Sequence, residues 1–486
     1  MLTEERKEEK KFVKEIESME ENYSRWYLDI VRKADLMDYG PVKGTIIFKP
    51  YGYALWEGIQ KDLDRRFKET GHDNVYFPLL IPESYLQKEM SHVEGFAPEV
   101  AWVTQGGNEV LEERLVIRPT SETIICSAMS DWIHSYRDLP LKLNQWANVM
   151  RWERSTKPFL RTSEFLWQEG HTAHATYEEA EEETLQMLQV YKEFAEEFLA
   201  MPVITGRKTE NEKFAGAVHT YSIEALMSDG KALQAGTSHN LGQNFSKVFD
   251  IQFSDQENQL QYVYQTSWGV STRLIGGLIM THSDDRGLAL PPTIAPVQVV
   301  IVPILRGDTE PVLNMVATIE KELKCLGIRV KSDVRDGMSP GWKFNEYEMR
   351  GVPIRIELGP KDLEKGQFVL ARRDTGDKEF LPIAELATII PQRLIDIQEN
   401  MLLKAKTFME EHIYTADTID ELKAGLIENR GFYESWWCED IACLEEVKAE
   451  TGATARVIPF EQRSGSGKCI CCGKDSTTTI VLARAY

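Results

Sequence analysis

Apolar residues recur along the chain with two different periods, and these periods predict its helices and strands. From Phe12 to Ile30 they recur every third or fourth position, which predicts an amphipathic helix that Gly40-Pro41 breaks. Helices are also predicted over 52–70, 178–199 and 310–326. Short apolar runs typical of strands occur at 74–82, 298–304, 328–330, 352–358 and 367–373.

The order of these elements divides the chain. After residue 295, strands alternate with helices, which predicts a compact α/β module. Pro78 and Pro82 lie in the apolar run over 74–82. Because proline cannot donate a hydrogen bond to a sheet, we expect this run at an edge or an interface. Pro291-Pro292 and Asn400 mark the candidate boundaries of the α/β module.

The segment from Arg151 to His171, RWERSTKPFLRTSEFLWQEGH, is dense in charged and aromatic residues. We predict an antiparallel hairpin with its turn at Ser155–Pro158. Because side chains alternate along a strand, Arg151 and Glu153 should point the same way. The second strand would carry on the same face a further set of residues: Arg161, Ser163, Phe165, Trp167, Glu169 and His171.

This face suits a ligand that contains a purine, several phosphates and a zwitterion. An aromatic ring can stack on a base, and an arginine can bind phosphate or carboxylate oxygens with two parallel hydrogen bonds. A glutamate can accept from an amine. The alternative is an ion-pair ladder that serves only the structure of the sheet.

Composition bounds the class of protein. The chain has 486 residues, of which 42% are hydrophobic and 27% charged, and this indicates a protein of several domains with full cores. The formal net charge of −21 argues against non-specific nucleic-acid binding. We find no apolar run of membrane-spanning length and no apolar region of a signal peptide near the start, so we expect a cytoplasmic protein.

Five of the seven cysteines fall in the last fifty residues, and we interpret this cluster as a metal site before a disulfide framework. Cys438-x4-Cys443 supplies one pair. Cys469 can pair with Cys471 or with Cys472, and we choose Cys472 because a C-x2-C knuckle followed by glycine is common in zinc sites. Four thiolates at such spacings can hold a structural zinc ion.

Four segments in order resemble the motifs of class II aminoacyl-tRNA synthetases. The Arg151–His171 strip resembles motif 2, Lys49–Pro82 resembles motif 1 of the dimer interface, and WGVSTRLIGG with Arg273 resembles motif 3. Residues 288–304 resemble the junction to an anticodon-binding domain. The resemblance implies an α+β catalytic domain on an antiparallel sheet over 1–292. An α/β anticodon-binding domain over 293–402 and a small α+β zinc-binding domain over 403–486 would follow.

Within this class the chain is most similar to the prolyl-tRNA synthetases. RPTSE, FLRTSEFLWQEGH, QAGTSHNLGQNFSKVF and THSDDRGLALPP resemble that family's signatures. About a hundred residues separate His171 from Trp268, too few for the large editing insertion of the common bacterial form, so the compact archaeal and eukaryotic-type form fits best. A threonine enzyme would carry a zinc-binding cysteine in the motif 2 region, and this strip has none.

The resemblance implies a proline–tRNA ligase that forms prolyl-adenylate from proline and ATP with Mg²⁺, and then charges tRNA(Pro). The implied catalytic residues are Arg151, Arg161 and Arg273. The implied ATP-binding residues are Arg151, Glu153, Arg161, Thr162, Phe165, Gln234, Thr237, Ser271 and Arg273. The implied proline-binding residues are Thr120, Glu122, Arg151, Trp167, Glu169, His171 and His239.

The same resemblance implies a homodimer formed through motif 1. It also makes Arg335, Lys343 and Lys361 the candidates to contact the anticodon, with ordinary surface charge as the alternative for each. Two other functions stay open: a synthetase for another amino acid of the subgroup, and a non-catalytic relative that binds tRNA. The second would be expected to lose the motif arginines, whereas Arg151, Arg161 and Arg273 are all present.

Overall fold

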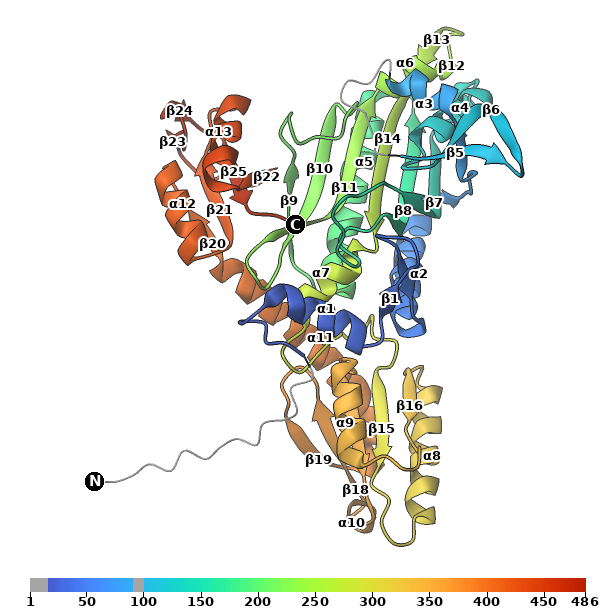
Figure 1. The fold of residues 1–486 in the computed structure, drawn as a ribbon, viewed down its shortest axis with the longest axis vertical. Helices are drawn as coiled ribbons and strands as arrows, with labels where there is room; N and C mark the ends of the chain where they lie inside the picture. Colours follow the sequence, from blue (N-terminus) through green and yellow to red (C-terminus); the bar gives the residue numbers. More distant parts are fainter. Residues whose placement is uncertain (1–15, 91–99) are drawn as a thin grey trace. The chain divides into compact units, whose positions relative to one another are not determined.

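The computed structural model describes residues 16–90 and 100–486, and the chain divides into two compact units. The first unit contains residues up to 37, residues 49–52 and residues 282–397. The second contains residues 38–48, 53–281 and 398–486. Figure 1 shows the elements of each.

The first unit is built on a mixed sheet in which the described strands follow the order β16-β15-β17-β18-β19. Their bounds are β15 Val299–Pro303, β16 Val330–Ser332, β17 Ile354–Leu358, β18 Gln367–Arg372 and β19 Lys378–Pro382. Helices α8 Glu310–Cys325, α9 Pro340–Met349 and α10 Pro360–Glu364 alternate with them. All of β15 is buried, as expected of a parallel strand covered on both faces. The predicted α/β module is confirmed.

The amphipathic helix predicted to begin near Phe12 is shorter in the structure than the spacing of apolar residues indicated. Helix α1 runs over Tyr23–Lys33 and buries Trp26 and Ile30, while Asn22 caps its start by accepting from the backbone N–H of Arg25. Residues 16–22 are not helical, although Ile16 is buried, and Phe12 lies outside the described residues. An apolar residue with helical spacing can therefore pack into a core without belonging to the helix.

The second unit contains a large sheet in which the described strands follow the order β20-β21-β25-β22-β9-β10-β11-β14-β8-β7-β3. Seven strands of this sheet come from the earlier part of the chain: β3 Asp73–Asn74, β7 Leu141–Met150, β8 Glu164–His174, β9 Val203–Arg207, β10 His219–Leu226, β11 Ala232–Gly242 and β14 Tyr264–Ser271. The last four are β20 Ile413–Thr415, β21 Phe432–Trp436, β22 Thr454–Pro459 and β25 Thr479–Ala483. The predicted antiparallel catalytic sheet is confirmed, since the pairs from β9 to β7 are all antiparallel.

Helix α5, Tyr177–Glu193, covers one face of this sheet (Figure 1). The hydroxyl of Ser238 donates to the Thr184 carbonyl, and the hydroxyl of Tyr191 donates to Gln168. Because strand residues alternate, the neighbours of Ser238 and Gln168 point to the opposite face, which is left for a ligand. The other helices are α2 Pro50–Glu69, α3 Glu83–Met90, α4 Glu122–Trp132, α6 Asn244–Phe249, α7 Arg273–His282, α11 Leu386–Glu411, α12 Ile419–Glu428 and α13 Ile441–Thr451.

The strand expected over 74–82 is divided. Asp73–Asn74 forms β3 at the edge of the large sheet, and Leu80–Pro82 forms β4 at the edge of a smaller sheet. Strands β5 Ala101–Gly106 and β6 Glu109–Ile117 complete that smaller sheet. Both pieces are edge strands, as Pro78 and Pro82 indicated.

The C-terminal segment continues the large sheet. Strand β22 pairs with β9, with Ile458 opposite Arg207. The last residue, Tyr486, donates its backbone N–H to the Ala232 carbonyl and its hydroxyl to Asp229. Its ring also lies 4.8 Å from the ammonium groups of Lys157 and Lys231, so the end of the chain is anchored beside the catalytic sheet.

Candidate functional site

A cavity of ≈330 Å³ opens on the sheet face opposite α5. Strands β8, β11 and β14 form its floor, and the loop after β7 forms one wall. The structure brings together in this cavity all the residues assigned by resemblance to ATP and proline: Thr120, Glu122, Arg151, Glu153, Arg161, Thr162, Phe165, Trp167, Glu169, His171, Gln234, Thr237, His239, Ser271 and Arg273.

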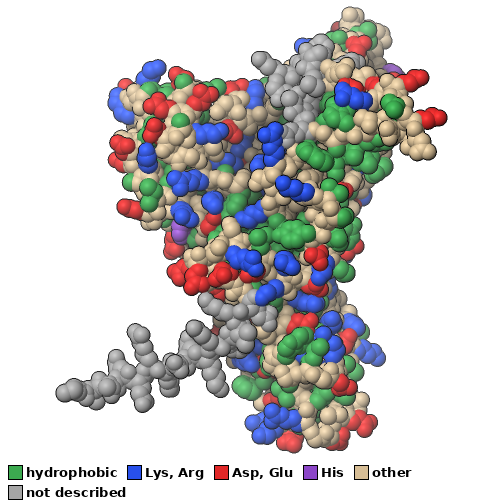
Figure 2. Space-filling view, viewed as in Figure 1, with side chains coloured by type: hydrophobic (Ala, Val, Ile, Leu, Met, Phe, Trp, Pro, Cys, Tyr) green, Lys and Arg blue, Asp and Glu red, His purple; other side chains and the backbone are tan. Residues whose placement is uncertain are grey.

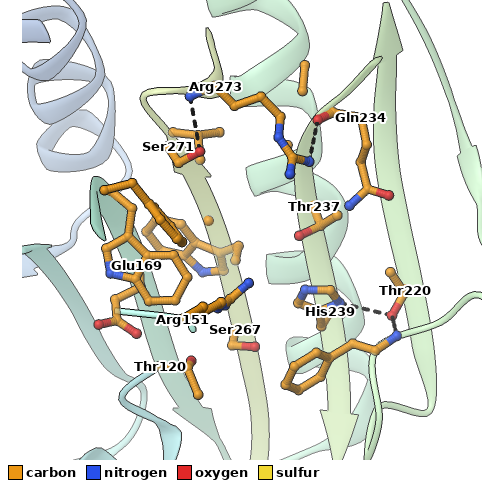
Figure 3. A pocket seen from close by; sticks show the side chains of 18 of the residues that line it. Thr120, Arg151, Glu169, Thr220, Gln234, Thr237, His239, Ser267, Ser271 and Arg273 are labelled. Atoms are coloured by element: carbon orange, nitrogen blue, oxygen red, sulfur yellow. Dashed lines mark hydrogen bonds between the residues drawn. The ribbon is translucent and has the colours of Figure 1, made fainter. Parts of the chain in front are cut away.

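Strand register arranges the floor in rows. One row, in which each residue is the registered partner of the next, is Thr220, His239, Ser267 and His171. The next row is Ser222, Thr237, Gly269 and Glu169. Figure 3 shows Arg273 and Gln234 at one end of the pocket and Thr120, Arg151 and Thr220 toward the other. A ligand with an anionic end and an amino end fits this order.

The hairpin predicted over 151–171 is wrong in the connection between its two strands. Strand β7 ends at Met150 and β8 begins at Glu164, so Arg151 and Arg161 belong to the loop between them. A bridge between Lys157 and Arg161 closes a small turn over residues 158–160 rather than at Ser155–Pro158. Ser163 is not among the residues that line the pocket, because its hydroxyl faces Gly44.

Arginines concentrate positive charge at one end of the pocket. The guanidinium of Arg273 donates to the carbonyls of Leu160 and Gln234 and, within the described residues, has no carboxylate partner. Burial, with repulsion from Arg161 and Arg151, lowers the pKa of Arg273 to about 10. Like charges held this closely favour a polyanion such as a triphosphate.

Arg151 lies over two aromatic rings. Its guanidinium carbon is 5.5 Å from the ring centroid of Phe165 and 5.5 Å from that of Trp167. Its Nε donates to the Pro119 carbonyl at 3.1 Å, which leaves the outer nitrogens for a ligand. The arginine is therefore held against the wall of the pocket by cation–π contacts and one backbone hydrogen bond.

The two carboxylates at the other end differ in their partners. Glu169 is almost fully buried and accepts hydrogen bonds from His171, Gln145 and Ser121 on its two oxygens. Glu122 accepts from the Thr120 hydroxyl. Glu169 is thus occupied by the protein, whereas Glu122 keeps free acceptor capacity toward a ligand.

His239 is neutral in this environment. Burial and the nearby His171 lower the pKa of His239 to about 3. The Thr220 hydroxyl accepts from the backbone N–H of Phe214 and is 2.9 Å from Nδ1 of His239. Its own proton can therefore go to Nδ1, which leaves Nε2 as the donor of the ring.

Several lining residues were missed by the sequence reasoning: Lys208, Glu212, Lys213, Phe214, Thr220 and Ser267. The Ser267 hydroxyl and the Trp167 Nε1–H are buried and have no hydrogen-bond partner in the described part of the chain. Alternation from Ser271 would have placed Ser267 on the pocket face. The loop residues carried no such signal, because no strand period fixes their direction.

In the first unit, a second cavity of ≈430 Å³ lies beside β17 and α9. Its charged lining residues are Asp285, Arg286, Glu348, Arg355, Arg372, Arg373 and Lys378. Arg355 and Lys378 both ion-pair with Glu357 and lie over the ring of Phe344, at 4.4 and 5.4 Å from its centroid. An aromatic ring flanked by cations suits an unstacked base next to a phosphate.

The three sequence candidates for anticodon contact lie outside this cavity's lining. Lys343 is buried and donates to the carbonyls of Asp333 and Arg335. Arg335 ion-pairs with Asp333 and Glu346. Lys361 is exposed at the start of α10. The ammonium of Lys343 is thus occupied by hydrogen bonds within the protein. Lys343 supports the segment that carries Arg335.

Four cysteines gather in the C-terminal segment. The sulfurs of Cys438, Cys443, Cys469 and Cys472 all lie within 4.8 Å of one another. Cys471 is not one of these four, and its thiol donates to Glu446 at 3.2 Å. The cluster has the donor set and the spacing that a tetrahedral zinc ion requires, and it contains the residue chosen from the sequence, Cys472.

Comparison with known proteins agrees with this geometry. Residues 103–282 match the family model of the tRNA synthetase class II core domain (G, H, P, S and T), and residues 298–393 match the anticodon binding domain. The fold and its pocket thus define the core of a class II aminoacyl-tRNA synthetase. Residues 419–486 match the model of the prolyl-tRNA synthetase C-terminal region.

Two relatives that match over their full length are named proline–tRNA ligase. One from Alkaliphilus oremlandii is 59% identical over 480 residues, which cover 99% of this chain and all of the relative. Another from Natranaerobius thermophilus is 59% identical over 483 residues, with the same coverage. A crystal structure of prolyl-tRNA synthetase from Cryptosporidium parvum, complexed with halofuginone and AMPPNP, superposes with a TM-score of 0.93 at 43% identity and covers 97% of this chain and 99% of its own. The chain belongs to the prolyl-tRNA synthetase family.

Proposed function

We propose that the pocket of the second unit activates L-proline with ATP and then transfers the prolyl group to the 3′ end of tRNA(Pro). The observation that supports this best is that two groups line the same pocket: Arg273, which has no carboxylate partner among the described residues, and Glu122, which keeps free acceptor capacity. The proline carboxylate attacks the α-phosphate, and pyrophosphate leaves. The protein therefore has to align two anions and spread their charge.

At the phosphate end, Arg151 would bridge the proline carboxylate and the α-phosphate. Arg161 and Arg273 would bind the outer phosphates, and Phe165 would stack on adenine with Glu153 on the adenine side. Thr162, Gln234, Thr237 and Ser271 would line the nucleotide pocket. Magnesium would enter with ATP as part of the substrate, where its charge offsets that of the phosphates.

At the amino end, Glu122 and Thr120 would accept the two hydrogens of the secondary ammonium. Glu169 would orient His171 rather than bind the substrate, because its oxygens already accept from the protein. Trp167 and His239 would enclose the ring. These contacts support proline as the substrate over the other amino acids of the subgroup. Amino-acid-dependent ATP–pyrophosphate exchange tests this choice. Exchange with another amino acid but not with proline would overturn it.

The rest of the chain would serve tRNA and assembly. The basic cavity beside β17 supports an anticodon site in which Arg355 and Lys378 add to the candidates Arg335 and Lys361, with Lys343 as a support. Lys and Arg side chains are frequent on the face of the molecule drawn in Figure 2, despite the net charge of −21. A local basic surface can therefore receive RNA on an acidic protein.

The four-cysteine cluster would hold a structural zinc ion. Cys438 follows β21, Cys443 lies in α13, and Cys469 and Cys472 lie between β23 Gly467–Lys468 and β24 Asp475–Ser476, so the ion would tie these pieces together. We keep the boundaries 1–292, 293–402 and 403–486 as the functional division of the chain.

We also propose a homodimer through the motif 1 region. Large apolar side chains near α2 are exposed, among them Tyr39 at 53%, Ile47 at 52% and Tyr76 at 71%. Exposed apolar surface of this kind marks protein interfaces. A solution mass of one chain, 55.7 kDa, rather than two would contradict this. None of the helices among the described residues combines the length and hydropathy needed to cross a bilayer, and we propose that the enzyme acts in the cytoplasm.

A further inference from the structure

A buried charge cluster links the C-terminal segment to the catalytic pocket. Glu224 on β10 is fully buried, and its Oε2 accepts from Nε and Nη2 of Arg456 at 3.0 and 2.8 Å. Its Oε1 accepts from Nζ of Lys208 at 2.8 Å and from the Ser222 hydroxyl at 3.0 Å. Arg456 lies on β22, 232 residues after Glu224, within the part of the chain that matches the C-terminal family model.

This cluster adjoins the phosphate end of the pocket. Lys208 lines the pocket itself. Glu224 is the registered partner of Gln234 on β11, and the Gln234 carbonyl accepts from Nη1 of Arg273 at 3.4 Å. Glu224 and Arg456 also act electrostatically on Arg273, Glu224 as an attracting charge and Arg456 as a repelling one.

The charges in the cluster do not balance. Two cations, Lys208 and Arg456, surround a single carboxylate, so the cluster carries one net positive charge. Arg273 makes its side-chain hydrogen bonds to carbonyl oxygens only, within the described residues. A carboxylate near an unpaired arginine would normally pair with it, and burial would strengthen that attraction.

We propose that Arg456 is a positioning residue for the activation step: it holds Glu224 with two hydrogen bonds and so keeps Arg273 free to bind the outer phosphates of ATP. The proposal rests on the role of Arg273 given above. On this proposal the C-terminal segment influences nucleotide binding electrostatically, through the charge of Arg456, without contacting the reacting atoms. A merely structural cluster would fasten β22 to β10 and leave ATP binding unchanged.

The test compares Arg456→Gln with Arg456→Lys and with the double variant Arg456→Gln/Glu224→Gln in proline-dependent ATP–pyrophosphate exchange. In Arg456→Gln, Glu224 can turn to Arg273, so KM for ATP should rise about tenfold while KM for proline stays within about twofold. Arg456→Lys should change KM for ATP less, because it keeps the charge. The double variant removes the competing carboxylate and should recover most of the lost kcat/KM for ATP.

A matched control is Arg484→Gln, which removes another arginine of the C-terminal segment whose partner is the Thr451 carbonyl. It should leave KM for ATP unchanged. The proposal is overturned if folded Arg456→Gln keeps the normal KM for ATP, or if the double variant is no better than Arg456→Gln. Should Arg456→Gln fail to fold, Arg456→Lys and the double variant decide. A tenfold rise in KM for ATP in either would overturn the proposal, because Arg456→Lys keeps the charge that holds Glu224 and the double variant has no carboxylate left to occupy Arg273. An unmodified enzyme without proline-dependent exchange would instead contradict the proposed function.

Discussion

Nε2 of His171 lies 3.0 Å from Oε2 of Glu169, and both side chains are about 5% exposed or less beside the pocket. Burial alone would lower the pKa of His171, but the hydrogen bond and charge of Glu169 raise it above the usual 6.5. Burial alone would raise the pKa of Glu169, but His171, Ser121 and Gln145 bring it below the usual 4.5. The two residues are therefore an ion pair between pH 4.5 and 6.5.

This pair predicts a pH-dependent contribution to stability. The His171 part is fully present below pH 6.5 and is lost as the pH rises through the raised pKa, and the Glu169 part is present above pH 4.5 and is lost as the pH falls through the lowered pKa. The difference in free energy of unfolding between the unmodified protein and Glu169→Gln should therefore be largest between these values, about 1–3 kcal/mol. Urea unfolding at pH 5.5 and 8.5 measures it.

The control for this measurement is Glu182→Gln, which removes an exposed carboxylate on α5. Its difference from the unmodified protein should stay small and similar at both pH values. A Glu169→Gln difference that does not shrink at pH 8.5 would show that His171 is not protonated in the folded protein.

Arg151→Ala should reduce adenylate formation by about 100- to 1000-fold, because the charge that develops at the α-phosphate loses its central cation. Pyrophosphate exchange under saturating proline and ATP measures the loss. Arg154→Ala is the matched control: Arg154 is exposed in the same loop and does not line the pocket. A loss of less than tenfold in Arg151→Ala would mean that Arg151 does not bridge the reacting groups.

The sequence predicted the floor of the pocket better than its edges. Strand alternation placed Phe165, Trp167 and Glu169 on one face, because a period of two leaves little freedom once one residue is assigned. It did not predict the long connection that carries Arg151 and Arg161, since a loop has no period. Ser267 could have been found by alternation, whereas Lys208 required knowledge of which strand lies next to β10.

The same limit applies to the fold as a whole. The α/β module over 299–382 followed from local patterns, because its central parallel strand, β15, is apolar along its whole length and strands alternate with helices after it. The pairing of β22 with β9 could not be predicted from local patterns, because Ile458 and Arg207 are far apart in sequence and nothing local specifies their pairing. Lys343 shows the corresponding limit for side chains: a lysine in a charged segment looks like a surface residue until its burial is seen.

Zinc content should distinguish the two neighbouring cysteines. Cys472→Ser removes a sulfur of the four-cysteine cluster and should lower bound zinc well below one ion per chain, while Cys471→Ser should keep it, because Cys471 faces Glu446. Elemental analysis after gentle purification measures both. Equal zinc content in the two variants, or none in the unmodified protein, would contradict this site.

Arg355→Ala should weaken tRNA charging without weakening proline activation, because Arg355 lines the basic cavity of the first unit and not the catalytic pocket. We expect kcat/KM for tRNA to fall about tenfold or more, as for the loss of a specific base contact, with pyrophosphate exchange unchanged. Lys361→Ala is the comparison on exposed α10. A larger loss in Lys361→Ala than in Arg355→Ala would move the RNA contact from the cavity to α10.

Alanine should be activated at a low but measurable rate. The pocket near Trp167 and His239 would recognise the proline ring by shape, and shape discriminates by only about 1–3 kcal/mol for each methylene. Alanine lacks two of the ring methylenes, so its kcat/KM in pyrophosphate exchange should be roughly 30-fold to 20,000-fold lower than that of proline. Glu122 and Thr120, in the role proposed above, would not reject alanine, since its ammonium would satisfy them equally well. Exchange with alanine at background level would mean that the pocket uses more than shape, for example an ordered closure that only the ring induces.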